Sequence, residues 1–330
     1  MSQVPDHGGK LDAARRRFPD APEPWLDLST GINPLPWPWP RPLPALAPEL
    51  WHRLPEETAL DALAAAAARY YGAPGPEHVA IAPGSQALIQ LLPRLRPPGR
   101  VCVEEPTYAE HALAWSAAGH RVAPFSPSPL PEVTVLVNPN NPDGRRLAPG
   151  TVAEMARRGA RRGGWLVVDE AFADVEPETS VAGRAGTPGL IVLRSFGKFF
   201  GLAGLRLGFA LAEPALAARI REAFGPWPVG GPVIELARAA FEDGVWIAAA
   251  RTRLAEAASR LDALLTARGL TVLGGTDLFR LAATADAQAI FARLGGAGIL
   301  VRRFEIDPTW LRFGLPADEA AWRRLDEALS

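Results

Sequence analysis

Lys198 is the residue of this 330-residue chain whose surroundings most suggest covalent chemistry. It ends the segment Ser195-Phe196-Gly197-Lys198, after the apolar run Leu190–Arg194 and before the glycine-rich run Gly201–Gly208. Burying an ammonium group is costly and lowers its pKa from about 10.4. A buried amine beside a phosphate-binding loop suits a Schiff base with pyridoxal phosphate. For Lys198 alone, a loop lysine that reaches solvent is an equally good interpretation.

Further segments with polar side chains follow predicted strands. In α/β sheets, ligands bind at the carboxyl ends of strands. The turn Pro83-Gly84-Ser85-Gln86 opens a helix whose free N–H groups suit a phosphate dianion, although Ser85 can also be a simple N-cap. The segment Asn138–Gly144 holds two X-Pro steps that form a fixed turn, yet its asparagines exceed what a turn needs. We expect the Asn141 amide to donate to a phenolate oxygen.

Asp169 closes a wholly apolar strand, Trp165–Asp169. At about 4 Å from a pyridine nitrogen, a carboxylate favours the protonated ring by about 4 kcal/mol at an effective dielectric of about 20. That is about three pKa units, enough to keep the ring an electron sink. The competing role is a magnesium ligand, but no glycine-rich loop ending in Lys-Ser or Lys-Thr accompanies it.

Three more side chains fit the same ligand. The hydroxyl of Ser195 and the guanidinium of Arg206, with the Lys198 amine, can surround an aldehyde-bearing phosphate ester. Tyr108 follows another predicted strand and can lay its ring on a flat cofactor, or be an ordinary half-buried tyrosine.

These residues must be positioned by an α/β fold. Seven apolar runs with helices between most of them predict a mostly parallel sheet between helices. The runs are 78–82, 101–104, 121–124, 133–137, 165–169, 190–194 and 206–211. Helices are predicted at 56–71, from 85, at 107–118, 151–162 and 245–268, and short strands at 270–273, 278–282, 299–302 and 310–313. We expect an arm (1–48), a large domain (49–212) and a small α+β domain (213–330).

The proline-rich first 48 residues predict extended chain without a helix or a central strand. A disordered tail is one interpretation. Trp25, Ile32, Trp37 and Trp39 carry apolar area that is usually buried, so we favour an ordered arm packed on the body.

Bulk properties exclude several classes of protein. Lys+Arg of 35 against Asp+Glu of 36 leaves a net charge of -1, which indicates no nucleic-acid partner. The single cysteine, Cys102, excludes an internal disulfide and a cysteine metal cluster, and we expect no metal. With no apolar leader and no run of membrane-spanning length, we expect a cytoplasmic protein without a membrane partner.

The motifs Asn-Pro-x-Asn-Pro, Asp-Glu-Ala and Ser-Phe-x-Lys, in this order, resemble the fold-type-I pyridoxal-phosphate enzymes, specifically the histidinol-phosphate aminotransferase-like group. The resemblance spans nearly the whole chain. It implies the aspartate aminotransferase-like fold, a homodimer and pyridoxal 5'-phosphate as cofactor. It implies Lys198 as the Schiff-base lysine, Asp169 at the pyridine nitrogen, Tyr108 on the ring and Asn141 at the ring oxygen. It implies a phosphate site made by Gly84, Ser85, Gln86, Ser195 and Arg206.

Within this group, the arm and the C-terminal segments resemble the L-threonine-O-3-phosphate decarboxylases of cobalamin biosynthesis. The matching stretches are His7–Gly9, Asp27–Leu35, Ile299–Arg303 and Trp310–Gly314. The resemblance implies a phosphorylated amino acid as substrate, bound by His7, Gly8, Asn33, Asn141, Arg302 and Arg312. Two arginines and a histidine can balance a carboxylate and a phosphate. We assign Arg312 to the carboxylate, and Arg302 with His7 to the phosphate.

Two positions depart from the group. Phe172 stands where many of its aminotransferases carry a tyrosine that hydrogen-bonds the ring oxygen, and Leu54 where they often carry one that reaches the partner subunit's cofactor. A decarboxylase therefore remains the favoured hypothesis. The alternatives are an aminotransferase of the histidinol-phosphate type and a non-catalytic module that binds pyridoxal phosphate to sense a metabolite.

Overall fold

The computed structural model describes residues 7–39, 46–124 and 131–330. These residues form two compact units. The sheet unit comprises residues 37–39, 46–124, 131–140 and 146–247, and the C-terminal unit comprises residues 7–36, 141–145 and 248–330. The N-terminal arm is therefore divided between the two units after Pro36. Residues Asn141–Arg145 belong to the C-terminal unit, although the residues before and after them in the sequence belong to the sheet unit. The expected division into three domains stays a prediction.

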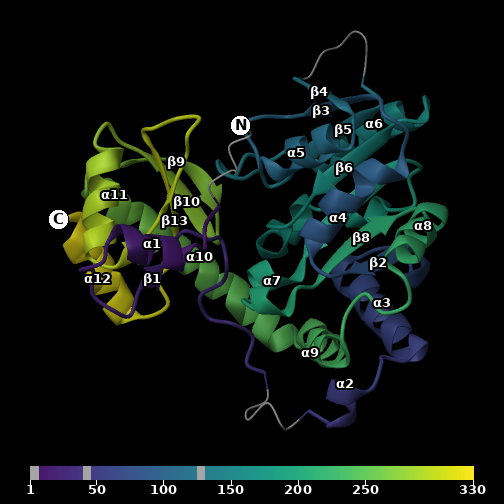
Figure 1. The fold of residues 1–330 in the computed structure, drawn as a ribbon, viewed down its shortest axis with the longest axis horizontal. Helices are drawn as coiled ribbons and strands as arrows, with labels where there is room; N and C mark the ends of the chain where they lie inside the picture. Colours follow the sequence, from purple (N-terminus) through teal and green to yellow (C-terminus); the bar gives the residue numbers. More distant parts are fainter. Residues whose placement is uncertain (1–6, 40–45, 125–130) are drawn as a thin grey trace. The chain divides into compact units, whose positions relative to one another are not determined.

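The sheet unit is built on seven strands (Figure 1). Their spatial order is β2 (Val79–Ala82), β8 (Gly208–Ala212), β7 (Leu190–Ser195), β6 (Trp165–Asp169), β5 (Val133–Val137), β3 (Arg100–Val103) and β4 (Arg121–Ala123). Only β8 runs against its neighbours, while every other adjacent pair is parallel. The mostly parallel seven-stranded sheet predicted from the apolar runs is confirmed.

Helices cover this sheet because their apolar sides are buried against it. The helices are α2 (Glu49–His52), α3 (Glu57–Tyr71), α4 (Ser85–Leu91), α5 (Glu110–Ala117), α6 (Pro149–Ala160), α7 (Phe196–Phe199), α8 (Pro214–Phe224) and α9 (Gly231–Glu242). Short 3₁₀ turns lie at Pro76–His78, Leu92–Leu95, Ala173–Val175, Pro177–Thr179, Ala182–Arg184 and Ala203–Leu205. Side chains of α4, α5 and α8 pack into one core with the central strands. Gly72, left-handed at φ 72°, ends α3 as predicted.

The C-terminal unit contains an antiparallel sheet in the order β12 (Arg302–Arg303), β13 (Trp310–Gly314), β10 (Phe279–Ala283) and β9 (Thr271–Thr276). Its helices are α10 (Gly244–Ala267), α11 (Ala287–Gly296) and α12 (Glu319–Leu329). The arm contributes α1 (Leu11–Arg17) and β1 (Leu26–Asp27), which pairs in parallel with β11 (Ile299–Leu300).

The prediction that the first 48 residues contain no helix is wrong. The helix α1 ends before Pro19, so no proline interrupts its backbone hydrogen bonds. Of the four apolar side chains that favoured a packed arm, Trp37 is buried and Trp25, Ile32 and Trp39 are partly buried, and the packing of the arm as a whole stays a prediction. Leu28 and Trp37 are 1% and 6% exposed, and the indole of Trp37 donates to Asp243 at 3.1 Å.

Candidate active site

The predicted cofactor residues of the sheet unit lie at one edge of its sheet. Asp169 and Ser195 end the parallel strands β6 and β7, and Lys198 lies one helical turn beyond. Ser85 and Tyr108 follow β2 and β3, which run in the same direction. The carboxyl ends of parallel strands meet at one edge, so the topology gathers the side chains that the sequence singled out.

Four of these residues form what we term the phosphate cup: Gly84, Ser85, Ser195 and Arg206. Gly84 has a φ of 87°, a conformation that favours glycine, and a Cβ there would lie 2.8 Å from Arg206 Nη2, so the guanidinium lies against this glycine. A Cβ on Gly208 would lie 2.3 Å from the Ser85 nitrogen, and Gly208 pairs with Ser195 across β7 and β8. Backbone N–H groups, hydroxyls and a cation therefore come together, as a phosphate requires.

Arg206 is held in an unusual backbone conformation. At φ 53° it is the single non-glycine residue with positive φ in the part of the chain that the structure describes. Left-handed backbone costs a non-glycine residue roughly 1–2 kcal/mol and persists only where the surroundings enforce it. Its place beside Gly84 in the phosphate cup agrees with a functional reason for this strain.

Gln86 and Tyr108 are joined by their side chains. The Tyr108 hydroxyl lies 3.1 Å from Gln86 Oε1, and Gln86 Nε2 donates to Glu110 Oε2 at 2.7 Å. A carboxylate only accepts hydrogen bonds, so Glu110 turns the Gln86 amide oxygen toward Tyr108, and Tyr108 must be the donor. Glu110 was not among the site residues predicted from the sequence. The role of Gln86 at the cofactor phosphate stays a prediction.

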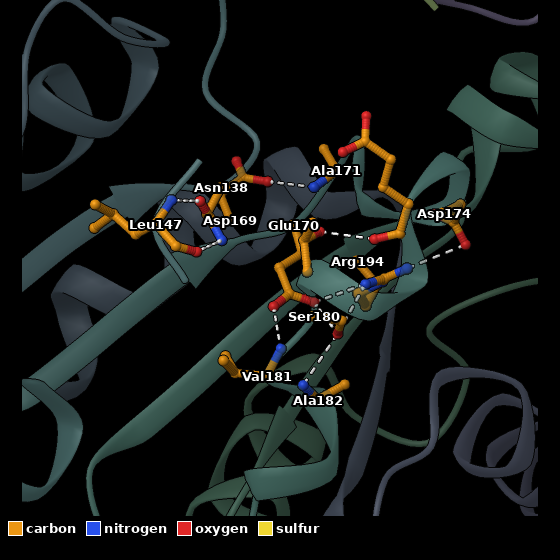
Figure 2. Close-up of polar contacts among 12 residues, drawn as sticks. Asn138, Leu147, Asp169, Glu170, Ala171, Asp174, Ser180, Val181, Ala182 and Arg194 are labelled. Carbon is orange, nitrogen blue, oxygen red and sulfur yellow. Dashed lines mark hydrogen bonds and ion pairs between the residues drawn. The ribbon is translucent and has the colours of Figure 1, made fainter. Parts of the chain in front are cut away.

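Asp169 has a buried histidine partner that the sequence analysis also missed. Asp169 and His111 are 3% and 1% exposed, and His111 Nε2 lies 2.9 Å from Asp169 Oδ2. Asp169 Oδ1 accepts the backbone N–H of Ala171 at 3.0 Å (Figure 2). Because a carboxylate accepts, His111 carries its proton on Nε2. The two interactions engage both oxygens of the Asp169 carboxyl group and fix its orientation.

Lys198 lies in the short helix α7 among aromatic side chains. Phe196 and Phe199 on either side of it are fully buried, and Lys198 Nζ lies 5.9 Å from the centroid of the Phe172 ring. Phe172, the residue that departs from the aminotransferase pattern, is 5% exposed and therefore lies buried near the Lys198 amine.

A second group of predicted residues belongs to the C-terminal unit: Arg302, Arg312 and Asn141, here termed the arginine group. Arg312 is 3% exposed and stands opposite Arg302 in the β12–β13 register. It donates to Asn141 Oδ1 and, at 2.8 Å, to the carbonyl of Ser29. Burial and the charge of Arg302 hold the pKa of Arg312 well below its usual value, which Asp27 opposes. A bound anion would offset both effects.

The arm brings His7 and Gly8 to Ser29, whose carbonyl also binds Arg312. A Cβ on Gly8 would lie 2.2 Å from the Ser29 carbonyl oxygen, and the Gly9 nitrogen donates to Ser29 Oγ at 2.7 Å. Asn33 is 2% exposed, and its Oδ1 accepts the backbone N–H of Leu35 at 3.0 Å, which fixes a turn. His7, Gly8, Asn33 and the arginine group thus belong to one unit.

The aminotransferase class I and II family profile matches residues 23–329. The chain belongs to this family. It is 49% identical to the threonine-phosphate decarboxylase of Pseudomonas aeruginosa over 98% of this chain and 97% of that protein. It is 46% identical to the threonine-phosphate decarboxylase of a Sinorhizobium species over 100% of this chain and 99% of that protein.

Solved structures give the same fold. The histidinol-phosphate aminotransferase from Sinorhizobium meliloti, determined in complex with pyridoxal-5'-phosphate, superimposes with a TM-score of 0.80 at 22% identity, covering 99% of this chain and 94% of that one. The aspartate aminotransferase-like fold is thereby confirmed. Enzymes of this family depend on pyridoxal phosphate, so the expected cofactor is confirmed as well. None of the described helices combines the length and apolar character needed to cross a membrane.

Proposed function

We propose that this protein decarboxylates L-threonine O-3-phosphate to (R)-1-amino-2-propanol O-2-phosphate, a step of cobalamin biosynthesis. Its similarity at 49% and 46% identity, over essentially the full length, to two threonine-phosphate decarboxylases carries the proposal. The arginine group agrees with it, because a phosphorylated amino acid brings two anionic groups to balance two cations.

The residues of the sheet unit fit pyridoxal phosphate. The phosphate cup offers N–H groups, hydroxyls and a cation, Lys198 offers the amine for the aldehyde, and Asp169 offers a buried carboxyl group for the ring nitrogen. When bound, the cofactor withdraws the electron pair that a departing group leaves at the substrate Cα. Asp169 would face the ring nitrogen, and His111 would hold the Asp169 carboxyl group in place.

The remaining residues bind the substrate and move a proton. We propose that Arg312 holds the substrate carboxylate while Arg302 with His7 holds the phosphate. The bond from Cα to the carboxylate breaks, carbon dioxide leaves, and the Lys198 amine delivers a proton to Cα. Phe172 carries no hydroxyl, so the hydrogen bond that a tyrosine would give to the ring oxygen is left to Asn141.

The proposal is tested by supplying O-phosphothreonine and histidinol phosphate side by side. Carbon dioxide should be released from the first, and neither compound should pass its amino group to a 2-oxo acid at a comparable rate. An aminotransferase differs only in which Cα bond lies perpendicular to the cofactor ring, so transfer without carbon dioxide would replace the proposed reaction by that one. The full-length similarity to enzymes leaves no support for a non-catalytic module.

We also propose a homodimer in the cytoplasm. The sheet unit carries large apolar side chains that are exposed beyond half, among them Trp51 (57%), Leu54 (63%) and Trp227 (54%). A Cβ on Gly231 would lie 2.7 Å from the Leu50 carbonyl oxygen, so α2 and the start of α9 are in contact beside these side chains. Such exposed apolar area supports an interface between copies. Light scattering should give twice the chain mass, and Leu54→Glu should shift it toward the monomer.

A further inference from the structure

A group of buried charges in the sheet unit plays no part in the proposed reaction. Glu170, Asp174 and Arg194, here termed the buried clamp, are 0%, 2% and 3% exposed. Arg194 Nη1 donates to Glu170 Oε2 at 2.7 Å, and Arg194 Nη2 lies 3.1 Å from Asp174 Oδ1 (Figure 2). Glu170 also accepts the Val181 N–H at 2.7 Å and the Ser180 hydroxyl.

The clamp occupies the reverse side of the strand ends that carry the cofactor residues. Successive side chains of an extended strand point to opposite faces. Glu170 follows Asp169 at the end of β6, and Arg194 precedes Ser195 in β7. The Glu170 N–H donates to the Leu193 carbonyl at 2.9 Å, so the hydrogen bonding between β6 and β7 extends as far as Glu170. The ion pair therefore joins the two strands behind Asp169 and Ser195.

Arg194 is connected to the surroundings of Lys198 through two segments of the chain. Arg194 precedes Lys198 by four residues. Asp174, its second partner, lies two residues after Phe172, whose ring centroid is 5.9 Å from Lys198 Nζ. The Arg194 guanidinium thus restrains both the segment that carries Lys198 and the segment that carries Phe172.

Stability alone accounts poorly for this arrangement. Two carboxylates share one guanidinium away from water, and burial raises the pKa of Glu170 as well as those of the neighbouring Tyr70 and Tyr71 hydroxyls. Replacing a buried ion pair by apolar side chains of similar volume is often neutral or stabilising. What apolar side chains cannot supply is directional bonding that fixes the separation of three backbone segments.

We propose that the buried clamp is a positioning device that fixes Lys198 relative to Asp169 and Phe172. This inference rests on the proposed function only in taking Lys198 as the residue that holds the cofactor. The clamp residues touch neither substrate nor cofactor, and they act through the ends of β6 and β7.

The test compares Arg194→Lys with Arg157→Lys in the holoenzyme. Lysine keeps the charge but loses the fork that binds both carboxylates. Arg157 is the matched control, because it pairs with Glu154 at 2.7 Å on the exposed side of α6 in the same unit. The readouts are the pH midpoint of the cofactor absorbance band without substrate, and hydrogen exchange in residues 195–201. Arg194→Lys should shift the midpoint by about half a pH unit or more and speed exchange about tenfold, and the control should change neither.

A loss of thermal stability with an unchanged midpoint and unchanged exchange would make the clamp merely structural and overturn the proposal. Should Arg194→Lys not fold, Glu170→Gln, which keeps the side-chain shape, is judged by the same criteria. Failure of both variants to fold would make the clamp a folding element and likewise overturn it. The absorbance midpoint needs no turnover, so a wild-type protein that releases no carbon dioxide refutes the proposed function and leaves this test intact.

Discussion

Replacing Arg312 by lysine tests which anionic group the arginine group binds. Arg312 is 3% exposed and already donates to the Ser29 carbonyl at 2.8 Å and to Asn141. Lysine at this position keeps a cation but loses the bidentate geometry. A buried charge-assisted hydrogen bond contributes about 1.5–3 kcal/mol. Losing one such bond to the substrate lowers kcat/KM for O-phosphothreonine by roughly 10- to 150-fold.

The loss should fall mainly on KM. A carboxylate that leaves as carbon dioxide gives up its negative charge in the transition state, so its arginine stabilises the bound substrate at least as much as the transition state. The assay is carbon dioxide release at varied substrate concentration, with Arg303→Lys as the matched control. Arg303 lies on the neighbouring strand β12, donates to Gln288 at 2.8 Å and stacks on Phe291, so its change should alter kcat/KM less than about twofold.

Two inhibitors separate the anionic groups. L-threonine has the carboxylate without the phosphate, and O-phosphoethanolamine has the phosphate without the carboxylate. Arg312→Lys should weaken inhibition by threonine and leave inhibition by phosphoethanolamine within about twofold, and Arg302→Lys should do the reverse. The opposite pattern would show that the two arginines are assigned the wrong way round. Unchanged inhibition by both compounds in both variants would refute the reasoning that the arginine group binds substrate.

Three further predictions concern the sheet unit. His111→Phe removes the donor to Asp169, so kcat should fall about tenfold with little change in KM, and a kcat equal to wild type would contradict that role. Glu110→Gln frees the Gln86 amide to turn away from Tyr108, so a fluorescence titration should show roughly three- to tenfold weaker cofactor binding, and unchanged affinity would rule out the orienting role. Burial raises the pKa of the Cys102 thiol to about 11, so its thiolate is scarce at pH 8 and a disulfide reagent should modify it only after unfolding. Rapid modification of the folded protein would contradict its burial.

The sheet and the edge that carries the cofactor residues could be predicted from the sequence because both depend on local patterns. Apolar runs of four to six residues locate buried strands, and each polar residue after such a run falls at a strand end. The arginine group could not be located in the same way. Arg302 and Arg312 are ten residues apart in the sequence and become neighbours only through the β12–β13 register, and Asn141 joins them from a segment far along the chain.

The contact of His111 with Asp169 could not be predicted from the sequence, whereas the buried clamp could have been. His111 meets Asp169 across 58 residues, through the packing of α5 on the sheet, and no local pattern specifies that pairing. The clamp was within reach, because Asp169-Glu170 and Arg194-Ser195 each join a residue for the cofactor side to a charged residue behind it, and the charges of Glu170 and Arg194 are opposite. Period-two alternation, applied to two adjacent parallel strands, places Glu170 and Arg194 on the same reverse face. Two opposite charges on a fully buried face must pair, so the ion pair follows from the rule that located the cofactor residues.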